Sequence, residues 1–239
     1  MTMQNVKTKE NSKSFLYIIA TPIGNLKDIT LRASEILQSV DLILCEDTRV
    51  TAKLLARYDI QKPLQSYHQH SKLAKVERIL EAFEEGKNIA LVSDAGTPGI
   101  SDPGGLLVEE VARRFGGEVK IIPIPGANAA LAALSVSGFP TDRFMFLGFP
   151  PHKKGRKTFF DEVAAREETQ VFYESKHRIE KALAELAERL GDRPIVVARE
   201  LTKQFETIYR GTAEECLAKL QRDKILGEFV VVVKAEKQT

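Results

Sequence analysis

Residues 89–105 read IALVSDAGTPGISDPGG, and this stretch decides how the chain around it folds. Its first four residues are apolar and of strand length, and residues 106–115 carry apolar side chains at helical spacing. The thirteen residues 93–105 hold four glycines, two prolines and two aspartates. Glycine permits positive φ angles and close backbone approach, whereas proline stiffens a loop. We therefore predict a rigid loop that presents polar groups to a ligand, with a plain strand-to-helix turn as the alternative.

The loop does not match the common phosphate-binding patterns. Its glycines do not form the G-x-G-x-x-G motif. The G-K-[ST] motif, which follows an earlier glycine in a phosphate loop, does not occur either. The sequence therefore favours a ligand that is recognised by shape and by backbone contacts.

The same alternation of apolar runs and amphipathic runs extends along the whole chain. Strands are predicted at 16–20, 42–45, 89–92, 119–122, 144–147, 171–173, 195–198 and 229–233. Helices are predicted at 30–40, 51–58, 72–85, 106–115, 127–136, 178–190 and 213–220. Continuous apolar strands separated by helices predict mainly parallel sheets. We predict an α/β protein with two α/β domains, at 15–140 and 141–239, after a flexible tail at 1–14.

The composition excludes several classes of protein. Of 239 residues, 43% are hydrophobic and 28% are charged, which disfavours disorder and coiled coils. No run of about 18 uncharged apolar residues occurs, so we expect no membrane span. Two cysteines far apart disfavour a disulfide framework and a metal site, and they favour the cytoplasm. A net charge of +2 does not by itself indicate nucleic acid.

Residues 93–104 resemble the signature of the tetrapyrrole methylase superfamily. Other stretches agree with it in order, and together the resemblance covers about residues 15–234. These stretches are IATPIGNLKDIT at 19–30, CEDTR at 45–49, PGANA at 125–129, FYESKHR at 172–178 and RELTK at 199–203. The chain is similar, more narrowly, to the branch that methylates the ribose 2′-hydroxyl of a cytidine in small-subunit ribosomal RNA.

The resemblance implies two α/β domains, S-adenosylmethionine bound in a cleft between them, and a homodimer. It also implies a set of cofactor-binding residues. They are Pro22, Asp94, Ala95, Gly96, Thr97, Ile100, Ser101, Asn128, Ala129, Tyr173 and Glu174. The partner implied is small-subunit ribosomal RNA or the ribosomal subunit itself.

Two groups of cations are candidates for RNA binding. Residues 152–157 carry Lys153, Lys154, Arg156 and Lys157, which could hold several phosphates or form an ordinary solvated loop. The second group is Lys176, His177 and Arg178, at the predicted start of a helix. Cations there oppose the helix dipole, which indicates a role toward substrate.

The candidate catalytic residues are Glu46, Asp47 and Arg49, directly after a predicted buried strand. They either orient the nucleophilic hydroxyl or its base, or they form a helix cap with an ion pair. We expect methyl transfer from S-adenosylmethionine to a ribose 2′-hydroxyl of small-subunit ribosomal RNA, with no metal. The alternatives are a small-molecule methyltransferase with a tetrapyrrole-type acceptor, and a non-catalytic RNA-binding module on the same fold.

Overall fold

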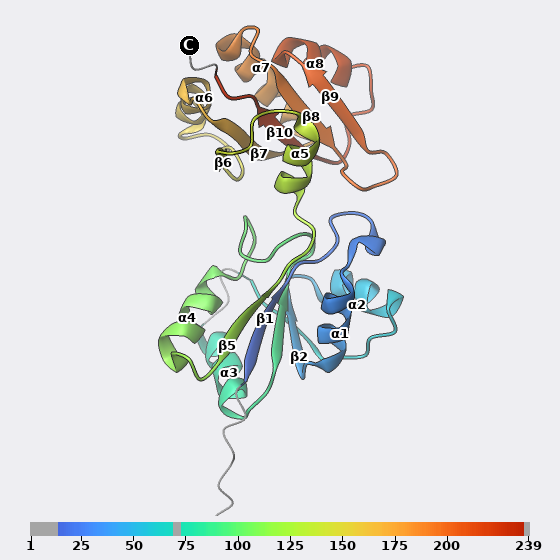
Figure 1. Ribbon diagram of the computed structural model, residues 1–239, viewed down its shortest axis with the longest axis vertical. Helices are drawn as coiled ribbons and strands as arrows, with labels where there is room; N and C mark the ends of the chain where they lie inside the picture. Colours follow the sequence, from blue (N-terminus) through green and yellow to red (C-terminus); the bar gives the residue numbers. More distant parts are fainter. Residues whose placement is uncertain (1–13, 69–72, 237–239) are drawn as a thin grey trace, which may run out of the picture. The chain divides into compact units, whose positions relative to one another are not determined.

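The computed structural model describes residues 14–68 and 73–236, and it divides the chain into two compact units (Figure 1). The first unit holds the chain up to Thr21 together with Asp28–Gly126, and the second holds Pro22–Lys27 and the chain from Ala127 onward. Most of the tail predicted at 1–14 lies outside the described residues. Ser14 itself is buried, and its Oγ donates to the Phe83 carbonyl at 3.0 Å, so residue 14 is anchored rather than flexible.

The first unit contains one fully parallel sheet. Its strands are β1 (Phe15–Ile19), β2 (Leu42–Cys45), β3 (Leu64–Ser66), β4 (Ile89–Val92) and β5 (Lys120–Ile124), in the order β3-β2-β4-β1-β5. All four residues of β4 are buried because helices cover both faces of the sheet. One face packs against α3 (Leu73–Glu84) and α4 (Gly105–Phe115), and the other against α1 (Leu31–Ser39) and α2 (Thr48–Arg57).

The second unit contains a mixed sheet. Its strands are β6 (Phe144–Phe146), β7 (Thr169–Ser175), β8 (Ile195–Arg199), β9 (Thr207–Gly211) and β10 (Glu228–Val233), in the order β6-β7-β10-β8-β9. Only β6 and β7 pair in parallel, and the other three pairings are antiparallel. The predicted α/β class is confirmed. The prediction that the second sheet is mainly parallel is wrong, because β10, from the end of the chain, inserts between β7 and β8 and runs antiparallel to both.

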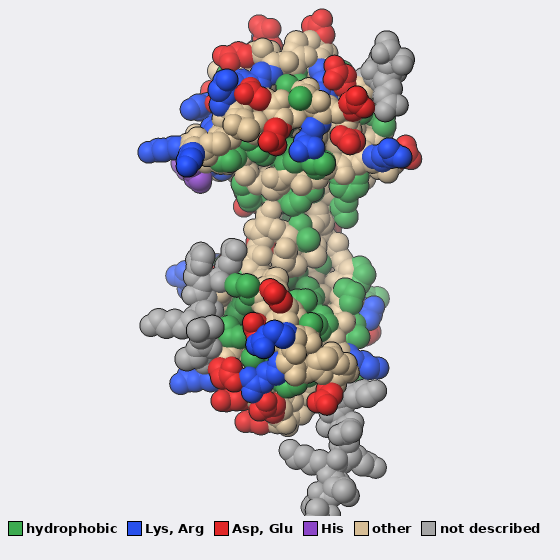
Figure 2. Space-filling model, turned by 90° about the vertical axis from the view of Figure 1, so that its left-hand side faces the viewer, with side chains coloured by type: hydrophobic (Ala, Val, Ile, Leu, Met, Phe, Trp, Pro, Cys, Tyr) green, Lys and Arg blue, Asp and Glu red, His purple; other side chains and the backbone are tan. Residues whose placement is uncertain are grey.

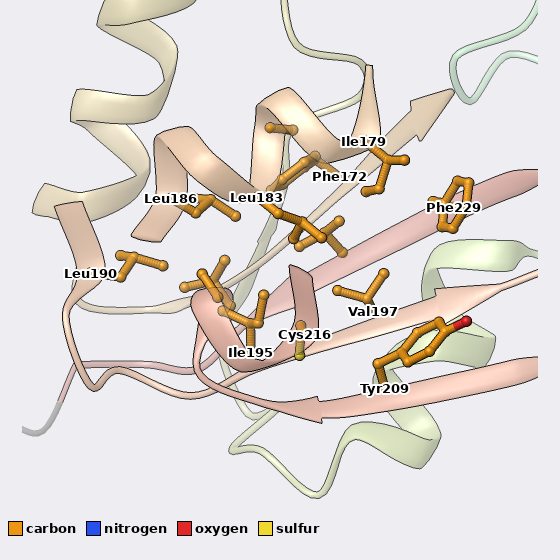
Figure 3. Close-up of a cluster of buried hydrophobic side chains, with 14 of the residues drawn as sticks. Phe172, Ile179, Leu183, Leu186, Leu190, Ile195, Val197, Tyr209, Cys216 and Phe229 are labelled. Carbon is orange, nitrogen blue, oxygen red and sulfur yellow. The ribbon is translucent and has the colours of Figure 1, made fainter. Parts of the chain in front are cut away.

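Apolar side chains from three helices cover one face of this second sheet (Figure 3). The helices are α6 (Arg156–Ala165), α7 (Ile179–Leu190) and α8 (Ala213–Leu220). Leu183 and Leu186 of α7 pack with Phe172, Val197 and other residues of the strands, and each fully buried side chain contributes roughly 1.5–3 kcal/mol. No helix in the described part of the chain is long and apolar enough to cross a membrane.

The other face of the second sheet packs against α5 (Ala129–Ser137). Ala130, Ala133 and Leu134 lie in one apolar cluster with Val196 and Val230 of the strands. The helix therefore belongs to the second unit, and the division falls at residues 126 and 127 rather than at 140 and 141. The Gly-Phe-Pro segment at 138–140 ends this helix and does not separate the units.

The segment Pro22–Lys27 also belongs to the second unit, although its flanks lie in the first. The backbone N–H of Asn25 donates to Thr202 Oγ1 at 3.1 Å. A Cβ atom on Gly24 would overlap Lys203 Cγ and would lie 3.0 Å from the Leu201 carbonyl oxygen. Glycine is therefore required at residue 24 by close packing against the 201–203 loop.

Two neighbouring glycines at the start of α4 provide a matched test of the predicted rigid loop. Gly104 has a φ of +146°, and a Cβ there would lie 3.0 Å from Leu91 Cδ2, whereas a Cβ on Gly105 would meet no atom within 4 Å. We expect Gly104→Ala to lower the free energy of unfolding by about 2–3 kcal/mol. The control, Gly105→Ala, should raise it by about 0.5 kcal/mol, because it restricts the unfolded chain. Urea titrations measure both, and equal stability of the two variants would contradict the strained-loop description.

Candidate functional site

The loop between β4 and α4 is held in an unusual backbone conformation. Gly96, Gly99 and Gly104 have positive φ angles, and so does Ser101, at 59°. A serine in the left-handed region costs on the order of 1 kcal/mol, so other contacts must hold the loop in place. The N–H of Gly99 donates to the Pro103 carbonyl at 3.2 Å, and the N–H of Ile100 donates to the Thr97 carbonyl at 3.3 Å. The predicted rigid loop thus has a specific set of internal hydrogen bonds.

A two-way backbone bridge fixes the middle of this loop to the end of β1. Thr21 N–H donates to the Gly96 carbonyl at 2.9 Å, and Gly96 N–H donates to the Thr21 carbonyl at 3.0 Å. The buried Ser93 hydroxyl also donates to the Gly96 carbonyl, at 3.1 Å. Both polar backbone groups of Gly96 therefore bond within the protein, and the expectation that its backbone contacts a cofactor is not supported. In the same loop, Ala95 and Ile100 are exposed and remain candidates.

Three carboxylates lie close together where β2 and β4 end. The Asp94 N–H donates to the Glu46 carboxylate, and Asp94 Oδ1 in turn accepts from the Asp47 N–H at 3.0 Å. Burial and then the charge of Asp94 raise the pKa of Glu46. Burial, followed by the charges of Glu46 and Asp94, raises the pKa of Asp102 to about 7. In the described ranges, no group of three or more acidic, His or Cys side chains is arranged to hold a metal ion.

Asp47 and Arg49 bond to each other and cap α2. Asp47 Oδ1 accepts from the Arg49 N–H at 2.8 Å, and Asp47 Oδ2 lies 2.6 Å from Arg49 Nη2. The hydrogen bonds from Arg49 lower the pKa of Asp47 to about 2. Asp47 is therefore a weak base, and the pair matches the alternative of a cap with an ion pair. Of the three candidate catalytic residues, Glu46 retains the properties of a proton acceptor.

In the second unit, polar groups gather at the start of α5. The Asn128 side chain caps this helix, because its Oδ1 accepts from the N–H groups of Ala130 at 3.1 Å and Leu131 at 3.2 Å. The Tyr173 hydroxyl also accepts from Ala130 N–H, at 3.3 Å. The structure thus brings Asn128, Ala129 and Tyr173 together at one helix end, and their contact with a cofactor stays a prediction.

Glu174 is only 1% exposed and lies among arginines. Its Oε1 is 2.8 Å from Arg178 Nη2, and its Oε2 is 3.5 Å from Arg156 Nη1. Arg156 is 4% exposed and also lies 2.9 Å from Glu185 Oε2. These charges stabilise one another inside the unit, so Glu174 as a cofactor ligand and Arg156 and Arg178 as RNA-binding residues are corrected to structural roles.

The remaining candidate RNA-binding cations are exposed on the second unit. Lys153 and Lys154 lie before α6, Lys157 lies in its first turn 3.6 Å from Asp161, and Lys176 and His177 lie before α7. Figure 2 shows Lys and Arg side chains beside a His side chain at one margin of this unit. The structure therefore leaves five of the seven predicted cations accessible to a polyanion.

The catalytic candidates chosen from the sequence missed Asp102. Asp102 lies in the 93–104 loop, and what distinguishes it is a half-buried position close to Glu46 and Asp94. Burial in a folded loop is not encoded in spacing or composition. The only sequence signal was the density of aspartates in the loop itself.

The chain is similar to known proteins over most of its length. Residues 15–217 match the tetrapyrrole (corrin/porphyrin) methylases. The chain is 49% identical to "Ribosomal RNA small subunit methyltransferase I" of Bacillus subtilis (strain 168), over 93% of this chain and 77% of that protein. It is 45% identical to the protein of the same name from Thermotoga maritima, over 91% of this chain and 97% of that protein.

Solved structures with a similar fold share less sequence. Uroporphyrin-III-C-methyltransferase from Thermus thermophilus aligns with a TM-score of 0.64 at 19% identity, over 92% of this chain and 94% of that chain. A cobalt precorrin-4 methyltransferase aligns with a TM-score of 0.68 at 21% identity, over 95% of this chain and 98% of that chain. These likenesses support the fold alone.

The pKa of Asp102 generates a prediction about stability and pH. A carboxyl whose folded pKa is raised to about 7 resists ionisation in the folded state. The contribution of this carboxyl to the free energy of unfolding is therefore complete below about pH 4, and it is lost as the pH rises through 7. We expect Asp102→Asn to be more stable than the unmodified chain at pH 8, by on the order of 2 kcal/mol. The difference should disappear near pH 4.

Urea titrations at several pH values measure this difference. The control is Asp142→Asn, at an exposed position on the second unit. A difference between the Asp102 variant and the unmodified chain that does not change with pH would refute the prediction.

Proposed function

The chain belongs to the tetrapyrrole (corrin/porphyrin) methylase family, and we propose that it transfers a methyl group from S-adenosylmethionine to small-subunit ribosomal RNA. It is a methyltransferase, as its family membership and its most similar relatives indicate. The observation that supports ribosomal RNA as the substrate is sequence identity. The chain is 49% and 45% identical, over more than nine-tenths of its length, to two relatives named as ribosomal RNA methyltransferases. We propose further that the acceptor is the ribose 2′-hydroxyl of a cytidine.

The residues in the first unit fit a cationic, partly apolar donor. Ala95 and Ile100 are exposed on a loop that its own hydrogen bonds hold rigid. The carboxylates of Glu46, Asp94 and Asp102 lie nearby and suit a positively charged group. S-adenosylmethionine supplies an activated methyl group on a sulfonium sulfur. In the second unit, Tyr173 and Asn128 at the start of α5 are the candidate contacts, together with the buried Pro22.

The chain's own residues mainly provide position and a proton acceptor. A ribose hydroxyl is a weak acid, so a base must take its proton during or after the attack on the methyl group. Glu46 is suited to this role because its raised pKa makes its carboxylate a stronger base than Asp47, which Arg49 neutralises. No other step needs a charged side chain, because the leaving group is already activated.

Exposed cations of the second unit would hold the RNA. Lys153, Lys154, Lys157, Lys176 and His177 are available for phosphate contacts, which position a substrate without reading its sequence. Arg156 and Arg178 stay with Glu174 and do not contribute. We propose that the chain acts in the cytoplasm as a homodimer, and a sedimentation mass near one chain of 26.7 kDa would exclude the dimer.

The proposed function is tested by following a labelled methyl group. Purified chain and labelled S-adenosylmethionine are offered isolated small ribosomal subunits, and a tetrapyrrole acceptor in parallel. We expect label in the ribosomal RNA, and ribonucleotide analysis should place it on a cytidine ribose. Glu46→Gln should lower kcat by about a hundredfold or more. Label in the tetrapyrrole alone, or in neither acceptor, would overturn the proposal.

The salt dependence of RNA binding tests the lysines. We expect Lys153→Ala/Lys154→Ala/Lys157→Ala to bind small-subunit RNA more weakly, with a log–log salt slope smaller by roughly 2–3, because three phosphate contacts are lost. Arg156 is kept, since its removal would leave Glu174 buried without one of its partners.

The matched control for charge is Lys181→Ala/Arg222→Ala/Lys224→Ala, which removes three exposed cations elsewhere on the second unit. Binding is measured by filter retention across a range of salt concentrations. Equal slopes for the two triple variants would show that residues 153–157 form only a solvated surface.

A further inference from the structure

A large aromatic side chain is exposed beside the lysines of the second unit. Phe149 is 52% exposed and lies in the loop between β6 and α6, three residues before His152. Single exposed apolar residues are common on protein surfaces, so exposure alone indicates nothing. What distinguishes Phe149 is how rigidly its loop is held and which side chains follow it.

The backbone before Phe149 continues the sheet. Leu147 N–H donates to the Val171 carbonyl at 2.9 Å, and Tyr173 N–H donates to the Gly148 carbonyl at 2.8 Å. The Phe149 ring packs edge-to-face against Tyr173, with centroids 5.4 Å apart and planes at 61°. The ring is therefore supported on one side by a half-buried aromatic residue of a central strand.

The backbone after Phe149 is fixed by the buried arginines. Pro150 and Pro151 restrict φ, and their carbonyls accept from Arg178 Nη1 at 3.0 Å and from Arg156 Nη1 at 3.4 Å. Both arginines are held in turn by Glu174. The exposed ring is thus presented on a pre-organised loop, which lowers the entropy cost of binding a partner.

Exposed basic side chains follow the ring directly. His152, Lys153 and Lys154 are exposed, and Lys157 is exposed one turn further along. A rigid aromatic face beside several cations is the combination that binds single-stranded nucleic acid, because bases stack on the ring while phosphates contact the cations. A base in a duplex is already stacked and paired, so the ring suits an unpaired nucleotide.

We infer that Phe149 is a stacking platform for an unpaired base of an RNA, with Lys153 and Lys154 on the adjoining phosphates. This inference rests on the proposed function, because it names how that RNA is gripped. Like the lysine contacts, base stacking on Phe149 does not depend on the RNA sequence; unlike them, it depends only weakly on salt.

The chain has no tryptophan, and this makes a direct test available. Phe149→Trp introduces a single tryptophan at the proposed platform, and a single-stranded oligocytidylate at low salt is the probe. We expect saturable quenching of its fluorescence as the base stacks. The control is Phe144→Trp, at the opposite end of β6, where the native residue is 42% exposed. Its fluorescence should change little.

Three outcomes of the fluorescence test would overturn the inference. One is an unchanged signal from the Phe149→Trp variant when filter retention shows that the oligonucleotide is bound. Another is no binding of the oligonucleotide at low salt, since a ring with adjoining cations predicts sequence-tolerant binding. The third is equal quenching in both variants, because the effect would then not be specific to residue 149.

Activity provides a second, independent readout. Phe149→Ala should raise KM for small ribosomal subunits about fivefold to a hundredfold with S-adenosylmethionine affinity unchanged, and Phe149→Tyr should restore the native value. Methylation by the unmodified chain together with a native KM for Phe149→Ala refutes the platform and leaves the proposed function intact. Absence of methylation by the unmodified chain refutes the proposed function itself.

Discussion

The second unit depends on how it neutralises one buried carboxylate. Glu174 lies on a central strand with 1% exposure, and an ionised carboxylate in such a place costs several kcal/mol unless opposite charges surround it. Arg156 from α6 and Arg178 from the start of α7 supply those charges. Because Arg178 Nη1 also donates to the Pro150 carbonyl and Arg156 Nη1 to the Pro151 carbonyl, the loop that carries the exposed lysines takes its shape from the same two arginines.

The first unit fixes its principal loop by a different means. Thr21 and Gly96 exchange two backbone hydrogen bonds, and Ser93 adds a third contact from its buried hydroxyl. The strain of a left-handed Ser101 is tolerated because these bonds hold Gly96, and because the hydrogen bond from Gly99 N–H to the Pro103 carbonyl closes the segment around residue 101. Each unit thus has one rigid loop at a strand end, one stabilised by backbone hydrogen bonds and the other by buried ion pairs.

The sequence predicted the elements whose signal is local. Ile89–Val92, α4 and the loop between them were recognisable because continuous apolar runs, helical spacing and glycine density are properties of neighbouring residues. The direction of strand pairing in the second sheet was not recognisable from the sequence, because apolar periodicity does not indicate that β10 inserts between β7 and β8. The segment Pro22–Lys27 belongs to the second unit because it packs against residues about 177 positions further along the chain. No local sequence pattern predicts such a contact.

The candidate site residues show the same difference between local properties, which the sequence predicts, and properties that depend on the fold. Charge can be read from a sequence, but whether a charge reaches solvent cannot: Arg156 and Lys157 are neighbours in a basic run, yet one is 4% exposed and the other lies on the surface. A net charge of +2 therefore averages over groups with opposite roles. Burial, followed by the charges of Glu46 and Asp94, raises the pKa of Asp102 to about 7, whereas lysines of the second unit remain exposed. Since 35 basic and 33 acidic residues nearly cancel over the whole chain, the net charge does not distinguish an RNA-binding protein from any other, and a prediction about RNA has to start from the exposed cations.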